Sequence, residues 1–144
     1  MFKTALVPVD IEVPGSWKLT LPVAEEFADR WGTEIHAVTV VPAFGMALVG
    51  SHFPKDYETK VVAEAEKRLR AAIADGAERP ERVHCHVREG RIYAEILAAA
   101  SELGADLVLM TAHRPELKDY LLGPNAARIV RHAPQSVFVI REQG

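Results

Sequence analysis

Short apolar segments alternate with longer amphipathic segments along this chain. Five apolar segments predict strands, and they span Thr4–Val9, Glu34–Val41, Arg82–Arg88, Ala105–Thr111 and Ser136–Arg141. The first, fourth and fifth contain continuous apolar runs, which are typical of strands covered on both faces. Strands that alternate with helices predict an α/β fold: an open, doubly wound parallel sheet of five strands with helices on both faces.

The third apolar segment has a different pattern. Val83 to Val87 alternate between apolar and polar residues, which predicts a less covered strand at the edge of the sheet. His84 and His86 then share one face, about 7 Å apart, a separation that two metal ligands can have. Because no third ligand stands in a readable motif, half-exposed packing residues are the favoured interpretation.

Helical spacing of apolar residues predicts four helices. The first begins between Trp17 and Leu21, with Trp17 and Trp31 on its core-facing side, and the others span Tyr57–Asp75, Ile92–Glu102 and Pro124–His132. Pro22 indicates that the first helix either starts within a turn of it or is kinked there. Ile92 is predicted on the core-facing side of its helix.

The segment Pro42 to Lys55 shows neither the helical spacing of apolar residues nor the alternation of a strand. It is long and unusually apolar for a loop. A surface connection and a lid or oligomer contact are equally compatible with it.

Composition narrows the class of protein. The 144 residues predict one domain, 1–144, and 49% hydrophobic content with a mean hydropathy of +0.00 predicts a globular chain. A formal charge of −3 argues against nucleic acid as the main partner. One cysteine, no leader pattern at the start and no run of 18 apolar residues predict a cytoplasmic protein without a membrane partner.

A candidate ligand residue follows the first strand. Doubly wound sheets bind ligands beyond the carboxyl ends of their strands, where the strand order reverses. Asp10 stands at such a place, and its carboxylate could accept a hydrogen bond from an adenine amino group or a ribose hydroxyl. A cap on the turn from Asp10 to Ser16 explains the same residue equally well.

A second candidate site follows the fourth strand. The segment from Thr111 to Ala127 contains His113 and Arg114 and ends in Gly123-Pro124-Asn125-Ala126 at a helix start. A helix N-terminus offers free N–H groups to an anion, so a phosphate site is one interpretation. The other interpretation is that Gly123-Pro124 is an ordinary helix-start sequence, and the residues alone favour this interpretation.

Motifs for catalysis are weak. The chain has no P-loop, no dinucleotide fingerprint and no G-x-S-x-G elbow, and nothing marks Cys85 as activated.

Three stretches together resemble the universal stress protein family. They are Ala5-Leu6-Val7-Pro8-Val9-Asp10, the stretch from Val87-Arg88-Glu89-Gly90 to Met110, and Ala112-His113-Arg114-Pro115 with Tyr120-Leu121-Leu122-Gly123-Pro124-Asn125-Ala126-Ala127. The last of these is similar to the F and G subgroup of bacterial members.

The resemblance implies a strand order of 3-2-1-4-5, a homodimer through the fifth strand with a tetramer as a further assembly, and ATP or another adenine nucleotide with accompanying Mg²⁺. The nucleotide-binding residues that it implies are Pro8, Val9, Asp10, Val40, Met110, Thr111, His113, Arg114, Gly123, Pro124, Asn125 and Ala126. No catalytic residue and no metal ligand of the protein itself is among them.

The chain departs from the family pattern at the phosphate loop. Thr111 and Arg114 stand where nucleotide-binding members have glycines, and Pro124 replaces a hydroxyl residue after Gly123. A Cβ limits close backbone approach to phosphate, and proline removes an N–H donor. Three functions therefore remain: a nucleotide-binding regulatory stress protein that is at most a slow ATPase, an oligomeric stress or adaptor protein without nucleotide, and an enzyme of the nucleotide α-hydrolase type, which is disfavoured.

Overall fold

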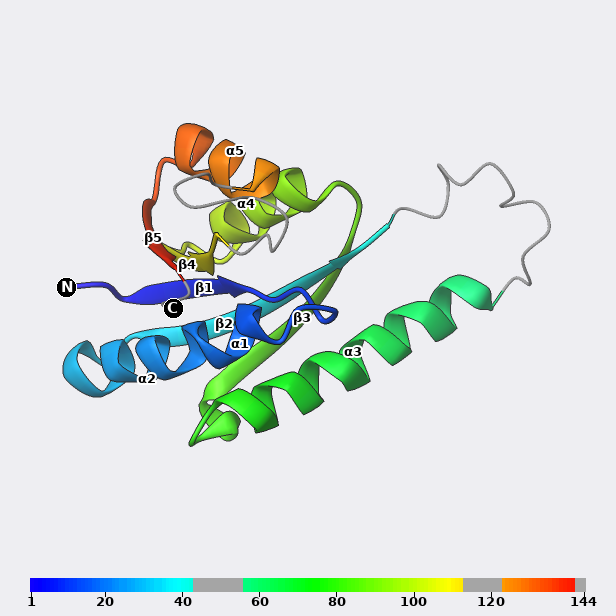
Figure 1. The fold of residues 1–144 in the computed structure, drawn as a ribbon, viewed down its shortest axis with the longest axis horizontal. Helices are drawn as coiled ribbons and strands as arrows, with labels where there is room; N and C mark the ends of the chain where they lie inside the picture. The colour runs from blue at the N-terminus through cyan, green and yellow to red at the C-terminus, as the bar shows by residue number, and fades with distance from the viewer. Residues whose placement is uncertain (43–55, 113–122, 142–144) are drawn as a thin grey trace.

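The computed structural model describes residues 1–42, 56–112 and 123–141. Within them, five parallel strands form one sheet in the order β3-β2-β1-β4-β5, so the expected fold class and strand order are confirmed (Figure 1). The strands are β1 (Thr4–Pro8), β2 (Glu34–Val41), β3 (Val83–Glu89), β4 (Leu107–Thr111) and β5 (Ser136–Ile140). β3 is an edge strand, as its alternating pattern predicted.

Helices cover both faces of this sheet (Figure 1). They are α1 (Gly15–Lys18), α2 (Thr20–Trp31), α3 (Tyr57–Gly76), α4 (Ile92–Glu102) and α5 (Pro124–His132), with one 3-10 turn, η3 (Pro80–Arg82). α2 and α3 lie on one face, and α4 and α5 lie on the other. In the described ranges, no helix is long and apolar enough to cross a bilayer.

Most predicted boundaries hold to within two residues, and the differences have local causes. β2, α4 and α5 have the predicted bounds. β4 begins two residues late because the N–H of Ala105 donates to Ala100 at the end of α4 instead of entering the sheet. β3 is shifted by one residue because Arg82 belongs to η3.

The first helical region is two helices instead of one. α1 and α2 are separated at Leu19, and Pro22 is the third residue of α2, where its missing N–H costs no intrahelical bond. The start within a turn of Pro22 is therefore confirmed. Trp31 is less buried than predicted, with 38% of its surface exposed, because its ring packs on Phe2 and Phe27 at the rim of the core.

The two faces of the sheet carry separate cores. Side chains alternate along β1, so that Ala5 and Val7 pack with α2 and α3 while Leu6 packs with α4 and α5. The face with α2 and α3 also buries Leu69 of α3, and the opposite face buries Ile129 of α5. Apolar contacts with all five strands thus hold the layer of α2 and α3, and contacts with β1, β2, β4 and β5 hold the layer of α4 and α5.

The long helix α3 has buried residues only from Ala65 onward. Its buried residues are Ala65, Leu69, Ala72 and Ile73, and none of its first eight residues is buried. Figure 1 shows the first turns of α3 extending beyond the sheet.

Glu25 is a buried carboxylate, 6% exposed, that fixes the connection between α3 and β3. It accepts hydrogen bonds from the backbone N–H groups of Glu78 (2.8 Å) and Arg79 (2.9 Å), and Arg82 lies 3.5 Å away. Its negative charge is therefore compensated inside the fold.

Candidate functional site

A cavity of about 450 Å³ opens at the carboxyl ends of β1, β2 and β4. The strand order reverses there, since β1 pairs with β2 on one side and with β4 on the other. The N-terminus of α5 forms part of its wall. Ten of the twelve predicted site residues line the cavity: Pro8, Val9, Asp10, Val40, Met110, Thr111, Gly123, Pro124, Asn125 and Ala126. The other two, His113 and Arg114, lie outside the described residues.

One part of the cavity wall is apolar. Val40 of β2, Met110 of β4 and Ile96 of α4 contribute side chains to it. Ile92 also lines it and is 48% exposed, so the prediction that Ile92 faces the core is wrong: it lies in the first turn of α4, beyond the reach of the core. An apolar wall of this kind suits a flat ring system.

Ser16 holds the loop that follows β1. Its hydroxyl accepts a hydrogen bond from the backbone N–H of Asp10 (2.9 Å) and donates one to the backbone oxygen of the same residue (2.9 Å). Because Ser16 is 6% exposed and belongs to α1, the start of α1 fixes the backbone of Asp10 at the cavity.

The Asp10 carboxylate caps a turn, one of the two roles that its position suggested. Its Oδ1 accepts a hydrogen bond from the N–H of Glu12 (2.9 Å). Its Oδ2 has no hydrogen-bond partner among the described residues, and Asp10 is exposed at the cavity. The turn thus occupies one oxygen of this carboxylate and leaves the other for a ligand.

The second carboxylate of the described lining, Glu12, is bound to α3. Arg68 donates to it at 2.7 Å and to the Ile11 backbone oxygen at 3.2 Å. The hydrogen bond and charge of Arg68 hold the pKa of Glu12 below its usual value. Both groups are exposed, so the pair orients the loop more than it stabilises the fold.

The N-terminus of α5 offers backbone donors to the cavity. Gly123 is its N-cap residue, with extended backbone, and Pro124 is the first helical residue. No side chain in the described ranges caps this end of the helix. The N–H groups of Asn125 and Ala126 in the first turn remain as donors, together with the positive end of the helix dipole.

Several lining residues were not anticipated from the sequence, among them Ser16 and Thr39. Thr39 is a single polar residue in the apolar run of β2, and that interruption was a usable signal. Ser16 had no comparable signal, because its role depends on a hydrogen bond across six residues.

His84 and His86 lie away from the cavity, on β3. Burial, followed by electrostatic repulsion from the His36, His84 and Arg88 side chains, lowers the pKa of His86 below its usual value. The structure also brings Glu34 and His36 of β2 next to them, a neighbourhood that the sequence pattern does not predict.

Comparisons with known proteins agree on one family. The sequence pattern of the universal stress protein family matches residues 1–141. Universal stress protein G of Escherichia coli O157:H7 is 35% identical over 98% of this chain and 100% of its own length, and the protein of the same name from Salmonella typhimurium is 34% identical over the same shares.

Solved structures show the same fold. The hypothetical protein MJ0577 superposes with a TM-score of 0.80 at 21% identity, covering 100% of this chain and 99% of its own. A universal stress protein in complex with cAMP superposes with a TM-score of 0.60 at 20% identity, covering 96% of both chains. Since the family pattern and these full-length relatives span nearly every residue, the chain belongs to the universal stress protein family.

Proposed function

We propose that this protein binds an adenine nucleotide in the cavity at the carboxyl ends of β1, β2 and β4 and acts as a regulatory protein of the stress response. The observation that carries the proposal is the joint position of an apolar wall, the Asp10 carboxylate and the α5 N-terminus around one cavity of about 450 Å³. That volume lies in the range of small-molecule sites. A related structure contains cAMP, which is itself an adenine nucleotide.

The lining residues fit the parts of such a ligand. Val40 and Met110 supply an apolar wall for the base, and Asp10 Oδ2 can accept a hydrogen bond from a ribose hydroxyl or the adenine amino group. The N–H groups of Asn125 and Ala126 suit a phosphate.

The cavity lining offers fewer ligands to Mg²⁺ than to the nucleotide. Mg²⁺ prefers carboxylates together with phosphate oxygens, and Glu12 is already engaged by Arg68. An accompanying Mg²⁺ would therefore be held by the phosphates and Thr111 more than by carboxylates.

One observation favours a second function, an oligomeric adaptor without nucleotide. Pro124 occupies the first position of α5 and removes one N–H from the phosphate side of the cavity. The loss of one charge-assisted hydrogen bond, about 1.5–3 kcal/mol, can separate a physiological binder from a non-binder. Nucleotide titration decides between the two functions.

The test is calorimetric titration of the protein with ATP, ADP, AMP and adenosine, on the wild type and two variants of Asp10. Asp10→Ala removes both the turn cap and the ligand contact, whereas Asp10→Asn keeps a carbonyl oxygen for the Glu12 N–H and replaces the other oxygen by a donor. If Asp10 binds the nucleotide, both variants lose about 1–3 kcal/mol of binding energy, a 5- to 150-fold drop in affinity.

The matched control is Asp29→Ala, which removes an exposed carboxylate of α2 far from the cavity lining and should leave affinity unchanged. Weaker binding in Asp10→Ala alone would assign Asp10 to the turn only. No binding of any nucleotide by the wild type would overturn the proposed function.

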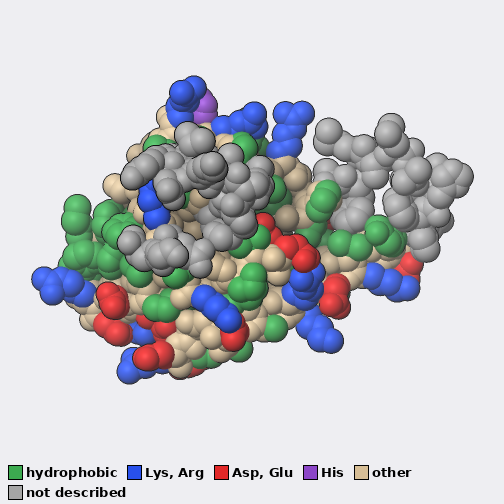
Figure 2. Space-filling view, viewed as in Figure 1, with side chains coloured by type: hydrophobic (Ala, Val, Ile, Leu, Met, Phe, Trp, Pro, Cys, Tyr) green, Lys and Arg blue, Asp and Glu red, His purple; other side chains and the backbone are tan. Residues whose placement is uncertain are grey.

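We further propose that two copies pair through β5. β5 is an edge strand of the sheet, with backbone donors and acceptors on its outer side, and Phe138 at its centre is 44% exposed. Figure 2 shows hydrophobic side chains gathered at the end of the molecule that carries the N-terminus, whereas acidic and basic side chains are interspersed over α2 and α3. An antiparallel two-fold pairing would cover the edge.

A further inference from the structure

Four ionisable side chains converge on one face of β2 and β3, away from the cavity. Glu34 and His36 share a face of β2, and the pairing of His36 with His84 places His84 and His86 on the same face of β3. Val38 on this face packs in the core beneath α4, which identifies the face. The cluster lies at the amino ends of these strands. His36 is four residues from Val40, about 13 Å along β2.

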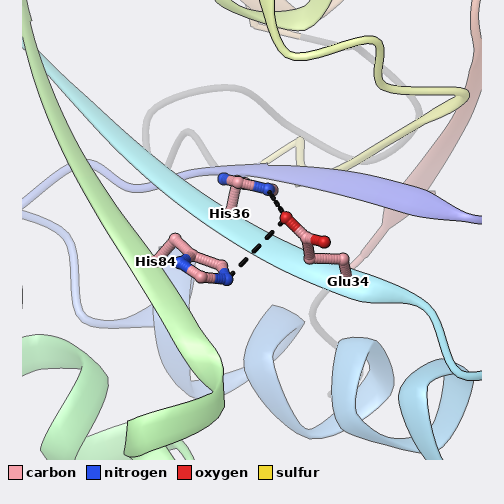
Figure 3. A group of neighbouring side chains, drawn as sticks. All are labelled: Glu34, His36 and His84. Atoms are coloured by element: carbon pink, nitrogen blue, oxygen red, sulfur yellow. Dashed lines mark hydrogen bonds and ion pairs between the residues drawn. The ribbon is translucent and has the colours of Figure 1, made fainter.

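The imidazole rings of His36 and His84 both approach the same carboxylate oxygen of Glu34. His36 Nε2 lies 2.6 Å from Glu34 Oε1, and His84 Nε2 lies 3.7 Å from it (Figure 3). One ligand atom from each of the three residues lies within 4.8 Å of the other two.

These separations are close to those of a metal centre. Tetrahedral Zn²⁺ has bonds of about 2.0–2.1 Å to nitrogen and oxygen, which puts its ligand atoms about 3.3 Å apart. The ligand atoms therefore need to move by about 1 Å. The side chains of Glu34 and His84 are 56% and 58% exposed, so they can make that adjustment without disturbing the core.

Burial and a contact with His86 hold the third ligand, His36, in place. It is 7% exposed, and its other ring nitrogen, Nδ1, lies 2.8 Å from His86 Nε2. Metal-bound histidines almost always donate their second N–H to a fixed acceptor, which sets the ring orientation and leaves the other nitrogen for the ion. The contact with His86 has the length of such a bond, and it takes this direction when the proton of His36 is on Nδ1 and Nε2 is left for an ion. It is independent of the distances among the three ligand atoms.

We propose that Glu34, His36 and His84 form a binding site for a divalent transition-metal ion of the Zn²⁺ class, with His86 as a positioning residue and solvent at the fourth position. Imidazole nitrogen and carboxylate oxygen are ligands that Zn²⁺ accepts. With both imidazoles neutral, the carboxylate gives the ligand set a charge of −1, which favours a dication. On binding, Zn²⁺ takes the place of the proton on His36 Nε2, which leaves to solvent. His36 Nδ1 takes the Nε2 proton of His86, and His86 takes a proton from solvent at Nδ1, so both rings stay neutral and His36 Nδ1–H donates to His86 Nε2.

The test is a Zn²⁺ titration of the full chain without a polyhistidine tag, in competition with a chromophoric chelator. We expect one Zn²⁺ per chain in the wild type and at least a tenfold weaker affinity in His84→Ala, whose exposed side chain is not needed for folding. The matched control is His132→Ala, an exposed histidine on α5, which should bind Zn²⁺ as the wild type does.

Two variants of His86 test its positioning role. His86→Leu should weaken Zn²⁺ binding by about 10- to 100-fold, the usual cost of losing such a partner. His86→Gln should recover part of that loss, because its amide oxygen can accept the His36 N–H. With Co²⁺ as a spectroscopic probe, the visible absorption of the wild type should indicate tetrahedral coordination and should change in His84→Ala.

Equal Zn²⁺ affinity in the wild type and His84→Ala would overturn the proposal and leave the cluster as a hydrogen-bonded group without an ion. An equal loss of affinity in His132→Ala would overturn it as well, since binding would then be nonspecific. The outcome is independent of nucleotide binding, which uses different residues.

Discussion

Asp106 connects the amino ends of β1 and β4 through its carboxylate. It accepts hydrogen bonds from the backbone N–H groups of Lys3 (3.0 Å) and Thr4 (3.1 Å). Partial burial alone would raise the pKa of Asp106, but these N–H groups together favour the charged form more strongly, so its pKa lies below the usual value. The charged carboxylate therefore contributes to the stability of the folded state.

This contribution should depend on pH. Because the pKa is lower in the folded state, the contribution is fully present above the unfolded pKa of about 3.9 and is lost as the pH falls through the folded pKa. We expect Asp106→Asn to unfold at lower urea concentration than the wild type at pH 7, with a difference that shrinks below about pH 4. Urea unfolding at a series of pH values measures it, and a difference that stays constant down to pH 3 would contradict this account.

The place of Asp10 could be predicted from the sequence, but its role could not. Its position after the first strand was enough to place it at the cavity, because parallel strands end at one edge of the sheet. The sequence left its turn-capping and ligand-binding roles as alternatives. The structure shows that one oxygen caps the turn at Glu12, and that the other lacks a partner in the described chain, so the two roles are compatible.

At the scale of helices and strands, periodicity predicted nearly every element. Elements flanked by residues that start or stop helices, such as α5 between Gly123 and Pro134, were predicted with both ends correct. The misses lie where a hydrogen bond at a helix end decides the boundary, as at Ala105, or where a break has no sequence signal, as at Leu19 between α1 and α2. Pattern alone carries no information about such contacts.

The N-terminus of α5 gives a prediction about phosphate affinity. Pro124→Ser restores one N–H and adds a hydroxyl at the first helical position, where both can reach the cavity. We expect the ratio of ATP affinity to adenosine affinity to rise about tenfold, the effect of one hydrogen bond to a charged group. Comparison with adenosine isolates the phosphate contribution, and calorimetry measures both ligands.

An unchanged ratio in Pro124→Ser would show that the first position of α5 does not contact phosphate. Asn125→Ala is a useful companion, since it alters the next side chain of α5 and leaves every backbone N–H in place. It should change the ratio less than Pro124→Ser does.

At the scale of the whole molecule, the exposed edge at β5 predicts assembly. Light scattering of the wild type at micromolar concentration should give twice the chain mass of 15.9 kDa. Phe138→Glu places a charge on the exposed centre of β5 and should shift the protein toward the monomer. The matched control is Val130→Glu, because Val130 is exposed to a similar extent, 45%, but lies on α5. A monomeric wild type would refute the pairing.

The arrangement of the cavity followed from topology, whereas the histidine cluster did not. The family resemblance implied this strand order and the site residues, and residues near the ends of strands one, two and four converge in any sheet of this order, so ten of the twelve implied residues meet at one place. Glu34 and His36 are separated from His84 by about fifty residues, and only the register between β2 and β3 brings them together. Register depends on side-chain packing across the pair, which a single sequence does not display.

The uneven burial of α3 means that its two halves do not share one stability. Opening the second half exposes Leu69 and Ile73 and disrupts the core beneath α2, whereas opening the first two turns exposes no buried side chain. Native-state amide exchange should therefore show a gradient along this one helix. Protection should approach the global unfolding energy near Leu69 and fall well below it before Glu64. Uniform protection from end to end would mean that a contact outside the sheet secures the first turns.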